Sequence, residues 1–267
     1  MNSPHSPSGP VFTAPAKKQL GQHFLADRHY IDKIVMAVNP KYGDRLVEIG
    51  PGQGAITLPL LRVHPKLTVI EFDRDLIAPL TAAAEPLGEL TIVHRDVLRV
   101  DFTELAAGHP IRLVGNLPYN ISSPILFHAL EHAAVIRDMH FMLQKEVVDR
   151  MAAGPGSKVY GRLSVMLQAY CQVTSLFVVP PGAFRPPPKV DSAVVRLVPR
   201  DPATINILDH KRFADVVKAA FGQRRKTLRN ALNTVVSAEQ FIAAGVRPDA
   251  RAEQLDVAEF IALANAS

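Results

Sequence analysis

The segment 46–54 constrains what this chain can fold into more than any other. It reads Leu-Val-Glu-Ile-Gly-Pro-Gly-Gln-Gly, an apolar strand that runs directly into closely spaced glycines, and residues 55–63 continue with helical periodicity. Glycine lets the backbone approach a ligand closely, and the amino end of a helix favours an anionic group. This order of elements predicts a nucleotide-cofactor site in an α/β sheet, with a purely structural glycine turn as the alternative.

Strands and helices alternate along the first 200 residues. The pattern predicts strands at 45–49, 67–72, 91–93, 111–114 and 139–143. It predicts helices at 27–38, at 55–63, from about residue 76, at 124–130 and at 162–171. Two late strands, 175–179 and 193–198, indicate an antiparallel hairpin at one edge. The alternation predicts a parallel, doubly wound sheet of the α/β class.

The pattern changes after residue 199, and from residue 209 only helical periodicity remains. The predicted helices are 209–220, 225–235, 238–243 and 251–264. We therefore expect three parts: a disordered tail at 1–16, an α/β domain at 17–200 and a small all-helical domain at 201–267.

Composition narrows the class of protein. The formal net charge of +5 and the pI of about 9.4 favour a polyanionic partner, although a solvated basic surface explains them equally well. The single cysteine, Cys171, lies in an apolar run and is predicted to be a buried structural thiol. The sequence contains no Cys/His metal spacing, no apolar run near the roughly 18 residues of a membrane span, and no secretory signal. We expect a cytoplasmic protein with no metal and no membrane partner.

The glycine loop by itself leaves the cofactor open. Gly50, Gly52 and Ala55 also fit the dinucleotide fingerprint G-x-G-x-x-A. Glu71 lies 21 residues beyond Gly50, where a dinucleotide fold places its ribose carboxylate. A nicotinamide oxidoreductase is therefore one reading of this loop.

Two further carboxylates favour a cofactor that contains adenosine. Glu48 lies two residues before Gly50, and Asp96 follows the third predicted strand. Such positions suit an adenosine, because Glu71 can accept hydrogen bonds from both ribose hydroxyls and Asp96 can accept one from the adenine amine. Taken alone, Asp96 is more typical of an ordinary turn at the end of a strand.

The tetrad Asn116-Leu117-Pro118-Tyr119 follows the fourth predicted strand. It resembles the pattern of amino-methyltransferases that act on adenine, cytosine or glutamine, and an adenine target shows why these residue types suit the chemistry. An exocyclic adenine amine is a poor nucleophile because its lone pair is delocalised into the ring. An asparagine oxygen and a backbone carbonyl can each accept one N–H and stabilise positive charge that develops on the nitrogen. The tyrosine ring can stack on the base. The alternative is a simple turn, since Asn and Pro both favour one.

Several segments together resemble one known family. They are 18–25, 48–54, 116–122, 184–192 and 221–228. On these motifs the chain resembles the small-subunit (16S) ribosomal RNA adenine N6,N6-dimethyltransferases of the KsgA type. The resemblance implies a Rossmann-like S-adenosylmethionine-dependent methyltransferase domain followed by a small helical domain. It also implies dimethylation of two adjacent adenosines in the loop of a hairpin near the 3′ end of that RNA, within a pre-ribosomal small subunit, by a monomer.

The resemblance also assigns residues to the site. It places the cofactor contacts at His23, Leu25, Gly50, Glu71, Asp96 and Asn116. It places the catalytic site at Asn116, Leu117, Pro118, Tyr119 and Phe184. Phe184 is expected to form a second stacking face opposite Tyr119, and the alternative is a hydrophobic plug in a proline-rich loop.

A basic cluster is the predicted RNA-docking surface. Residues 211–229 contain seven Lys or Arg and one acidic residue. The cluster proper consists of Arg224, Arg225, Lys226 and Arg229. Such a cluster suits phosphate neutralisation. By itself it is more typical of a solvated face, and its occurrence with a base-methylating site favours RNA docking.

Three other functions remain as alternatives. A large-subunit ribosomal RNA adenine methyltransferase shares the loop and the tetrad, but segments 186–190 and 223–228 favour the small-subunit family. A non-catalytic RNA-binding protein of the same fold would not need an intact tetrad. An oxidoreductase lacks a proton-relay constellation here and leaves the tetrad unexplained.

Overall fold

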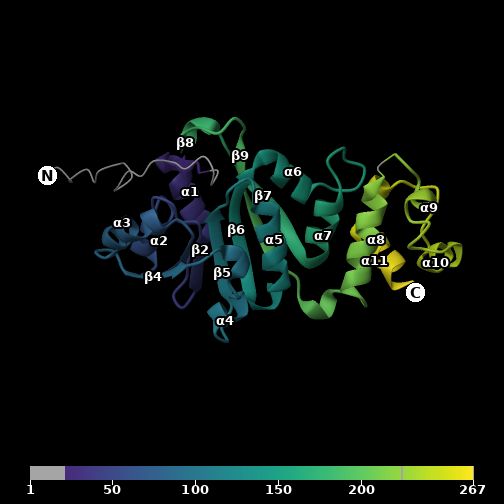
Figure 1. Cartoon of the computed structure of the whole chain (residues 1–267), viewed down its shortest axis with the longest axis horizontal. Helices are drawn as coiled ribbons and strands as arrows, with labels where there is room; N and C mark the ends of the chain where they lie inside the picture. Colours follow the sequence, from purple (N-terminus) through teal and green to yellow (C-terminus); the bar gives the residue numbers. More distant parts are fainter. Residues whose placement is uncertain (1–21, 224, 267) are drawn as a thin grey trace. The chain divides into compact units, whose positions relative to one another are not determined.

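The computed structural model describes residues 22–223 and 225–266 (Figure 1). The predicted tail at 1–16 and Arg224 lie outside the described residues. The chain divides into two compact units. Residues up to Lys145 together with Ser175–Leu197 form the first unit, and Glu146–Thr174 together with the chain from Val198 onward form the second.

A seven-stranded sheet in the order β4-β3-β2-β5-β6-β9-β7 organises the fold. Its parallel part consists of β4 (Glu89–His94), β3 (Lys66–Glu71), β2 (Arg45–Ile49), β5 (Ile111–Asn116) and β6 (Ile136–Gln144). The late strand β9 (Ser192–Pro199) pairs antiparallel with β6, and β7 (Cys171–Val179) follows it at the edge. The predicted Rossmann-like α/β class is confirmed, and β7 and β9 are neighbours at one edge.

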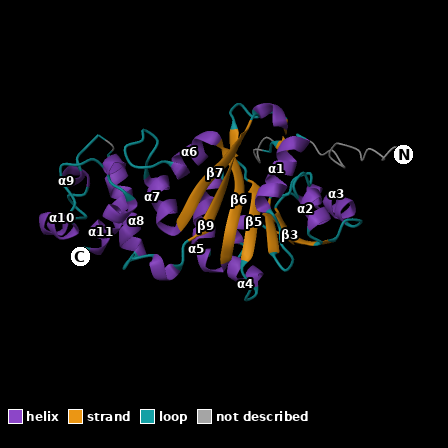
Figure 2. Cartoon of the chain, turned by 180° about the vertical axis from the view of Figure 1, so that it is seen from behind, coloured by secondary structure: helices purple, strands orange, loops and turns teal. Residues whose placement is uncertain are grey.

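Helices cover both faces of the parallel strands in the first unit. One side carries α1 (Arg28–Val38), α2 (Thr57–Val63) and α3 (Arg74–Ala84), which share one apolar core with the sheet. In Figure 2, α1 lies in front of the strands and α5 (Ser122–Glu131) lies behind them. Aspartates fix two helix starts, because Asp27 and Asp73 accept hydrogen bonds from the first-turn amides of α1 and α3. The short helix α4 (Phe102–Ala106) was not predicted.

Two very short strands were also missed by the sequence analysis. They are β1 (Phe24–Leu25) and β8 (Phe184–Arg185), which pair antiparallel as a separate two-stranded sheet. Ala183 O strengthens the contact by accepting hydrogen bonds from the amides of Ala26 and Asp27. This pairing joins two of the family-like segments that lie far apart in the sequence.

The second unit is helical apart from the strand ends that it contributes. Its helices are α6 (Lys145–Ala152, of which Lys145 is counted with the first unit), α7 (Arg162–Tyr170), α8 (His210–Gly222), α9 (Leu228–Ala231), α10 (Ala238–Ala244) and α11 (Val257–Asn265). Phe213 on α8 and Phe260 on α11 are fully buried in its core. Residues 146–174 therefore pack with the C-terminal helices, whereas the sequence placed them in the α/β domain. In the described part of the chain, no helix is long and apolar enough to cross a membrane.

Two predicted helices of this unit were wrong in extent. The helix expected at 225–235 is reduced to α9. It begins only at Leu228, because the amides of Leu228 and Arg229 donate to Ala250 O and Pro248 O and not to carbonyls of a preceding helical turn. The helix expected at 251–264 is divided into a 3₁₀ turn at Ala252–Gln254 and α11. The division falls at Asp256, which caps α11 by accepting from the Glu259 amide at 2.8 Å.

Cys171 begins β7 and is fully buried, as the sequence predicted. Burial raises the pKa of its thiol to about 12, so the group stays protonated. This is the environment of a structural thiol and not of a nucleophile.

A buried ion-pair network lies near the amino end of β5. Arg112 Nη1 donates to Asp44 Oδ2 at 2.7 Å, and its Nε donates to Asp138 Oδ1 at 2.8 Å. Burial by itself would raise the pKa of both carboxyls. Hydrogen bonds from the Lys41 amide and Arg112 to Asp44, and from Arg112 to Asp138, hold both pKa values below the usual range. The network ties β5 to β6 and to the loop before β2, at the end of β5 opposite to Asn116.

Candidate active site

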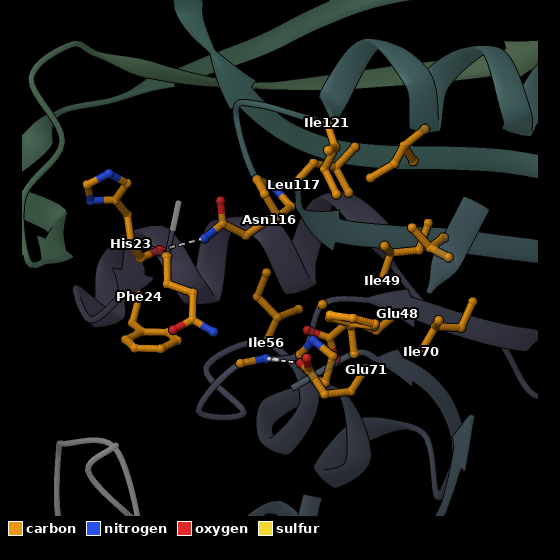
Figure 3. A pocket seen from close by; sticks show the side chains of 18 of the residues that line it. His23, Phe24, Glu48, Ile49, Ile56, Ile70, Glu71, Asn116, Leu117 and Ile121 are labelled. Carbon is orange, nitrogen blue, oxygen red and sulfur yellow. Dashed lines mark hydrogen bonds between the residues drawn. The ribbon is translucent and has the colours of Figure 1, made fainter. Parts of the chain in front are cut away.

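A cavity of about 280 Å³ lies at the carboxyl ends of β2, β3 and β5, within the first unit (Figure 3). This is the edge at which open α/β sheets bind their ligands. Every predicted cofactor residue and the whole tetrad contribute to its lining. They are His23, Leu25, Gly50, Glu71, Asp96, Asn116, Leu117, Pro118 and Tyr119. The structure therefore brings together residues that the sequence spreads over almost 100 positions.

The glycine loop needs its glycines for backbone conformation and for space. Gly50 and Gly52 have φ values of +66° and +56°, in the left-handed region that side chains rarely adopt. A Cβ on Gly52 would lie only 3.1 Å from the Phe24 ring. The Gly50 amide donates to Ile70 O at 2.9 Å, which ties the loop to β3. The loop is thus a fixed wall of the cavity.

Glu71 ends β3 and presents its carboxylate to the cavity. Its Oε1 accepts from the Asp73 amide at 2.6 Å, and its Oε2 lies 3.4 Å from the Gly52 amide nitrogen. Burial raises the pKa of Glu71, although these two amide hydrogen bonds lower it in part. A carboxylate held in this way keeps lone pairs available for the hydroxyls of a ribose.

Glu48 lies on the floor of the cavity and is almost completely buried. Thr57 Oγ1 donates to its Oε2 at 2.6 Å. Burial raises the pKa of Glu48 to about 8, and the neighbouring Glu71 contributes to the rise. Glu48 is therefore protonated at neutral pH in this structure, which reduces the charge repulsion between the two carboxyls.

Asp96 combines both of its expected roles. It follows β4 and caps the next 3₁₀ turn, because its Oδ1 accepts from the Leu98 amide at 3.0 Å. It also lines the cavity, on the side opposite to the tetrad along the sheet edge. A turn aspartate of this kind is held in place and can still accept a hydrogen bond from an adenine amine.

Asn116 is the last residue of β5, and its side chain is held in one orientation. Its Nδ2 donates to the backbone oxygen of His23 at 2.9 Å. Figure 3 shows the Asn116 oxygen on the other side of the amide, away from His23. The following Leu117 amide donates to Met142 O at 3.1 Å and fixes the start of the tetrad on β6. Asn116 Oδ1 is thus a positioned hydrogen-bond acceptor.

Tyr119 is held by a residue that the sequence analysis did not assign to the site. Its hydroxyl lies 2.7 Å from Oγ of Ser192, which is fully buried at the start of β9. Burial raises the pKa of the Tyr119 hydroxyl, so the group stays neutral. Ser192 ends the family-like segment 184–192, and that segment was the signal that could have identified it.

The structure does not bring Phe184 to the cavity. Its side chain has 0% exposure and packs in the apolar core beside Leu25, with which it pairs in β1 and β8. This placement favours the hydrophobic plug over the second stacking face expected from the resemblance.

The predicted RNA-docking residues belong to the second unit. Arg225, Lys226 and Arg229 are exposed around the start of α9, and Arg224 lies outside the described residues. Across residues 22–223 and 225–266, no three His, Cys, Asp or Glu side chains form a group that could hold a metal ion.

Comparison with known proteins now identifies the family. The model of the ribosomal RNA adenine dimethylase family matches residues 14–267. The chain belongs to this family. It is 82% identical over 254 residues to ribosomal RNA small subunit methyltransferase A of Xanthomonas oryzae pv. oryzae, covering 95% of this chain and 97% of the relative. The protein of the same name from Xanthomonas campestris pv. campestris is 80% identical over the same shares.

Solved structures agree with this assignment. A dimethyladenosine transferase from Plasmodium falciparum superposes with a TM-score of 0.77 at 26% identity, over 90% of this chain and 96% of that one. The 23S ribosomal RNA methyltransferase ErmE shares the fold, with a TM-score of 0.71 over 91% of this chain and 98% of that one, at 24% identity. The oxidoreductase reading of the glycine loop is thereby excluded, and the predicted methyltransferase class is confirmed.

The cofactor of this enzyme is S-adenosylmethionine, and the residues present fit it. The cavity offers a carboxylate at Glu71 that can accept from ribose hydroxyls, a carboxylate at Asp96 that can accept from an adenine amine, and a glycine loop open to close approach. The tetrad lines the same cavity.

Glu71→Ala should weaken S-adenosylmethionine binding by roughly 10- to 100-fold, because a hydrogen bond to a charged group contributes about 1.5–3 kcal/mol. Isothermal titration calorimetry gives the dissociation constant. Glu89→Ala is the matched control, since Glu89 is an exposed carboxylate at the opposite end of the neighbouring strand β4, paired with Lys66. Equal affinities in the parent and Glu71→Ala would show that Glu71 does not bind the ribose.

Proposed function

We propose that this enzyme dimethylates the N6 amines of two adjacent adenosines in a hairpin loop near the 3′ end of small-subunit ribosomal RNA. It acts within a pre-ribosomal small subunit, in the cytoplasm and as a monomer. Relatives 80–82% identical to this chain carry the name small subunit methyltransferase A, which supports this substrate over the large subunit. The observation that carries the proposal is that Glu71, Asp96 and the tetrad line one and the same cavity.

The chemistry depends on making an adenine amine nucleophilic. Asn116 Oδ1 accepts one N–H of the amine, and a backbone carbonyl of the tetrad accepts the other. Held by two acceptors, the nitrogen becomes pyramidal and its lone pair points into the cavity. The two oxygens also stabilise the positive charge that develops on nitrogen. When bound, S-adenosylmethionine supplies a methyl group on a positively charged sulfur, so the protein needs no covalent intermediate.

The structure supports this role through preorganisation. Asn116 is fixed by the His23 carbonyl, and Leu117 is fixed by Met142 O. An acceptor that is already in place needs no reorganisation during the reaction, and this is the source of most electrostatic catalysis. Tyr119 offers a ring on which the base can stack, and Ser192 holds its hydroxyl.

RNA binding is assigned to the basic cluster defined by Arg224, Arg225, Lys226 and Arg229. Phosphate contacts supply most of the affinity for RNA and make it salt-dependent. A loop adenine is unpaired or nearly so, and extruding it costs only a few kcal/mol. Exposed arginines and lysines at a helix start suit the phosphate backbone of such a hairpin.

Changing Arg224, Arg225 and Lys226 together to alanine should weaken RNA binding and reduce its salt dependence by about one unit of slope for each lost phosphate contact. Cofactor affinity should stay at the parental value. A control variant replaces the exposed Lys41, Arg62 and Lys66 of the first unit by alanine and loses the same charge. Filter binding over a series of salt concentrations compares the RNA affinity of the two variants and its salt dependence. An unchanged slope in the first variant would show that its cluster is only a solvated face.

The substrate itself is tested by incubating the protein with labelled S-adenosylmethionine and under-methylated small subunits. Mapping the label should give two neighbouring adenosines in one hairpin loop near the 3′ end of the RNA. Label confined to large-subunit RNA, offered in the same experiment, would overturn the proposal.

A further inference from the structure

The helix that follows the tetrad, α5, reaches the turn that carries Asp96. On this helix, His128 Nε2 lies 2.8 Å from Val100 O. Since a carbonyl oxygen can only accept, Nε2 carries the hydrogen of this bond. Val100 follows the 3₁₀ turn Val97–Arg99, and Asp96 caps the other end of that turn. His128 therefore connects α5 to the segment that presents Asp96 to the cavity.

Hydrogen bonds inside this segment fix Asp96 relative to Val100. Asp96 Oδ1 accepts from the Leu98 amide at 3.0 Å, and the Asp96 backbone oxygen accepts from the Arg99 amide at 2.9 Å. The Val100 amide donates to Val97 O at 3.1 Å. Because these i→i+3 and capping bonds close the turn on itself, a hydrogen bond to Val100 O also restrains the carboxylate of Asp96.

Apolar burial and the hydrogen bond restrain the turn in different ways. Val97 and Val100 are 7% and 5% exposed, so apolar contact keeps the turn on the body of the protein. Apolar contact is non-directional and by itself permits the turn to slide. A hydrogen bond weakens steeply when its angle is distorted, so it fixes the position of the turn. The donor is itself held, because the His128 ring packs against the fully buried Phe102 with the ring centroids 5.1 Å apart.

Helix α5 also contacts the tetrad, at its amino end. Ser122 Oγ donates to Tyr119 O at 3.2 Å. About one turn further along the helix, the fully buried Ile125 lines the cavity, and His128 follows after another turn. One helix thus contacts both the tetrad and the turn that carries Asp96.

We propose that His128 is a positioning residue for the cofactor: it holds Asp96 where the carboxylate can accept a hydrogen bond from the adenine amine of S-adenosylmethionine. His128 does not line the cavity, so it acts through the turn and not by contact with the cofactor. The inference rests on the expected contact between Asp96 and the adenine amine, and it does not depend on which RNA the enzyme methylates.

Variants at position 128 separate the donor from the ring. His128→Phe keeps a ring against Phe102 but cannot donate, His128→Leu removes both ring and donor, and His128→Gln keeps an N–H donor without the ring. His128→Phe and His128→Leu should weaken S-adenosylmethionine binding by about 2- to 10-fold, the effect of one hydrogen bond of ordinary strength. His128→Gln should bind close to the parent. Isothermal titration calorimetry measures these affinities without RNA.

A comparison of two ligands reports on Asp96 itself. S-adenosylhomocysteine carries the adenine amine, whereas S-inosylhomocysteine carries a carbonyl oxygen at the same position, which cannot donate to a carboxylate. The parent should prefer the adenosine compound by roughly 10- to 100-fold. His128→Phe and His128→Leu should reduce this preference by about 2- to 10-fold, and His128→Gln should keep it. A purely structural effect would weaken both ligands alike and leave their ratio unchanged.

His132→Phe is the matched control. His132 lies one turn further along α5 and also packs on Phe102, with the ring centroids 5.5 Å apart. Its Nδ1 lies 3.1 Å from Thr103 Oγ1 and 3.6 Å from Asp101 Oδ1, which follow the turn. The cofactor affinity and the ligand preference of this variant should therefore be parental.

A double variant tests whether His128 acts through Asp96. Asp96→Ala removes the carboxylate, so adding His128→Phe to it should not weaken S-adenosylmethionine binding further. A further loss would contradict the inference, because His128 would then act on another part of the cavity. A parental ligand preference in folded His128→Phe or His128→Leu, with urea unfolding as the check of folding, would overturn it as well.

The remaining outcomes distinguish this inference from the assignments around it. A parent that binds both ligands equally would overturn the contact of Asp96 with the adenine amine, and the inference with it. A parent that shows the expected ligand preferences but does not methylate small-subunit RNA would overturn the proposed function alone.

Discussion

Asn116→Ala should lower the rate of adenine methylation by about 10²–10³-fold, with RNA and cofactor both saturating. The change removes one acceptor that the His23 carbonyl holds in place, and its loss acts on the chemical step. RNA binding should survive, because phosphate contacts elsewhere supply most of the affinity. The measurement is a single-turnover time course with labelled S-adenosylmethionine and under-methylated small subunits.

The matched control for this variant is Asn120→Ala. Asn120 also lines the cavity but lies outside the tetrad and is exposed, so its loss should leave the rate near the parental value. The second methylation is an internal check, because monomethyladenine has a single N–H and must give up one of the two acceptor contacts or rotate its amine. Monomethylated and dimethylated products should therefore appear at different rates, and Asn116→Ala should slow both. A parental rate in Asn116→Ala would show that the tetrad does not act through this oxygen.

The cofactor half of the site could be predicted from sequence because a parallel sheet fixes where strand ends lie. Gly50, Glu71, Asp96 and Asn116 each end or follow a strand, and the carboxyl ends of neighbouring parallel strands meet at one edge. A local pattern of strand and turn is then enough to bring them together. Small errors in the predicted strand bounds do not affect this result.

Other parts of the site depend on contacts that no local pattern encodes. His23 and Pro186 are 163 residues apart, and Tyr119 and Ser192 are 73 residues apart. They meet because β1 pairs with β8 and because the chain returns antiparallel along β6 as β9. Strands of two residues carry no periodicity, so neither β1 nor β8 could be predicted.

The position of Phe184 also depends on a contact between distant segments. An aromatic residue in a proline-rich segment can serve as a stacking face for a base or as a hydrophobic plug, and its sequence context does not distinguish the two. The pairing of Phe184 with Leu25 places the ring in the apolar core, which favours the plug. A tertiary contact likewise replaces the first turn of the helix expected at 225–235, because Ala250 and Pro248 accept the amide hydrogens of Leu228 and Arg229.

Arg112→Met should destabilise the protein by about 3 kcal/mol, near the lower end of the range for breaking a buried ion pair. The Arg112 side chain is only 8% exposed and donates to Asp44, Asp138 and Val38 O. Its loss leaves two buried carboxylates, whose desolvation is then poorly compensated. The effect stays at the lower end because Arg137 still contacts Asp44 at 2.6 Å and Arg196 still lies 3.4 Å from Asp138. Urea unfolding measures the change in the free energy of unfolding.

Arg137→Met is the matched control, because it removes an arginine from the same network at a side chain that is 56% exposed. The exposed Arg137 is screened by solvent, and Arg112 still pairs with buried Asp44, so this variant should lose only about 1 kcal/mol and unfold close to the parent. Arg112 and Asn116 lie on the same strand, one near its amino end and one at its carboxyl end. Folded Arg112→Met, measured at low temperature, should therefore bind S-adenosylmethionine and methylate RNA at the parental rate. Asn116→Ala should instead unfold close to the parent and methylate slowly. Equal stability of Arg112→Met and Arg137→Met would show that burial of the network does not contribute to the fold.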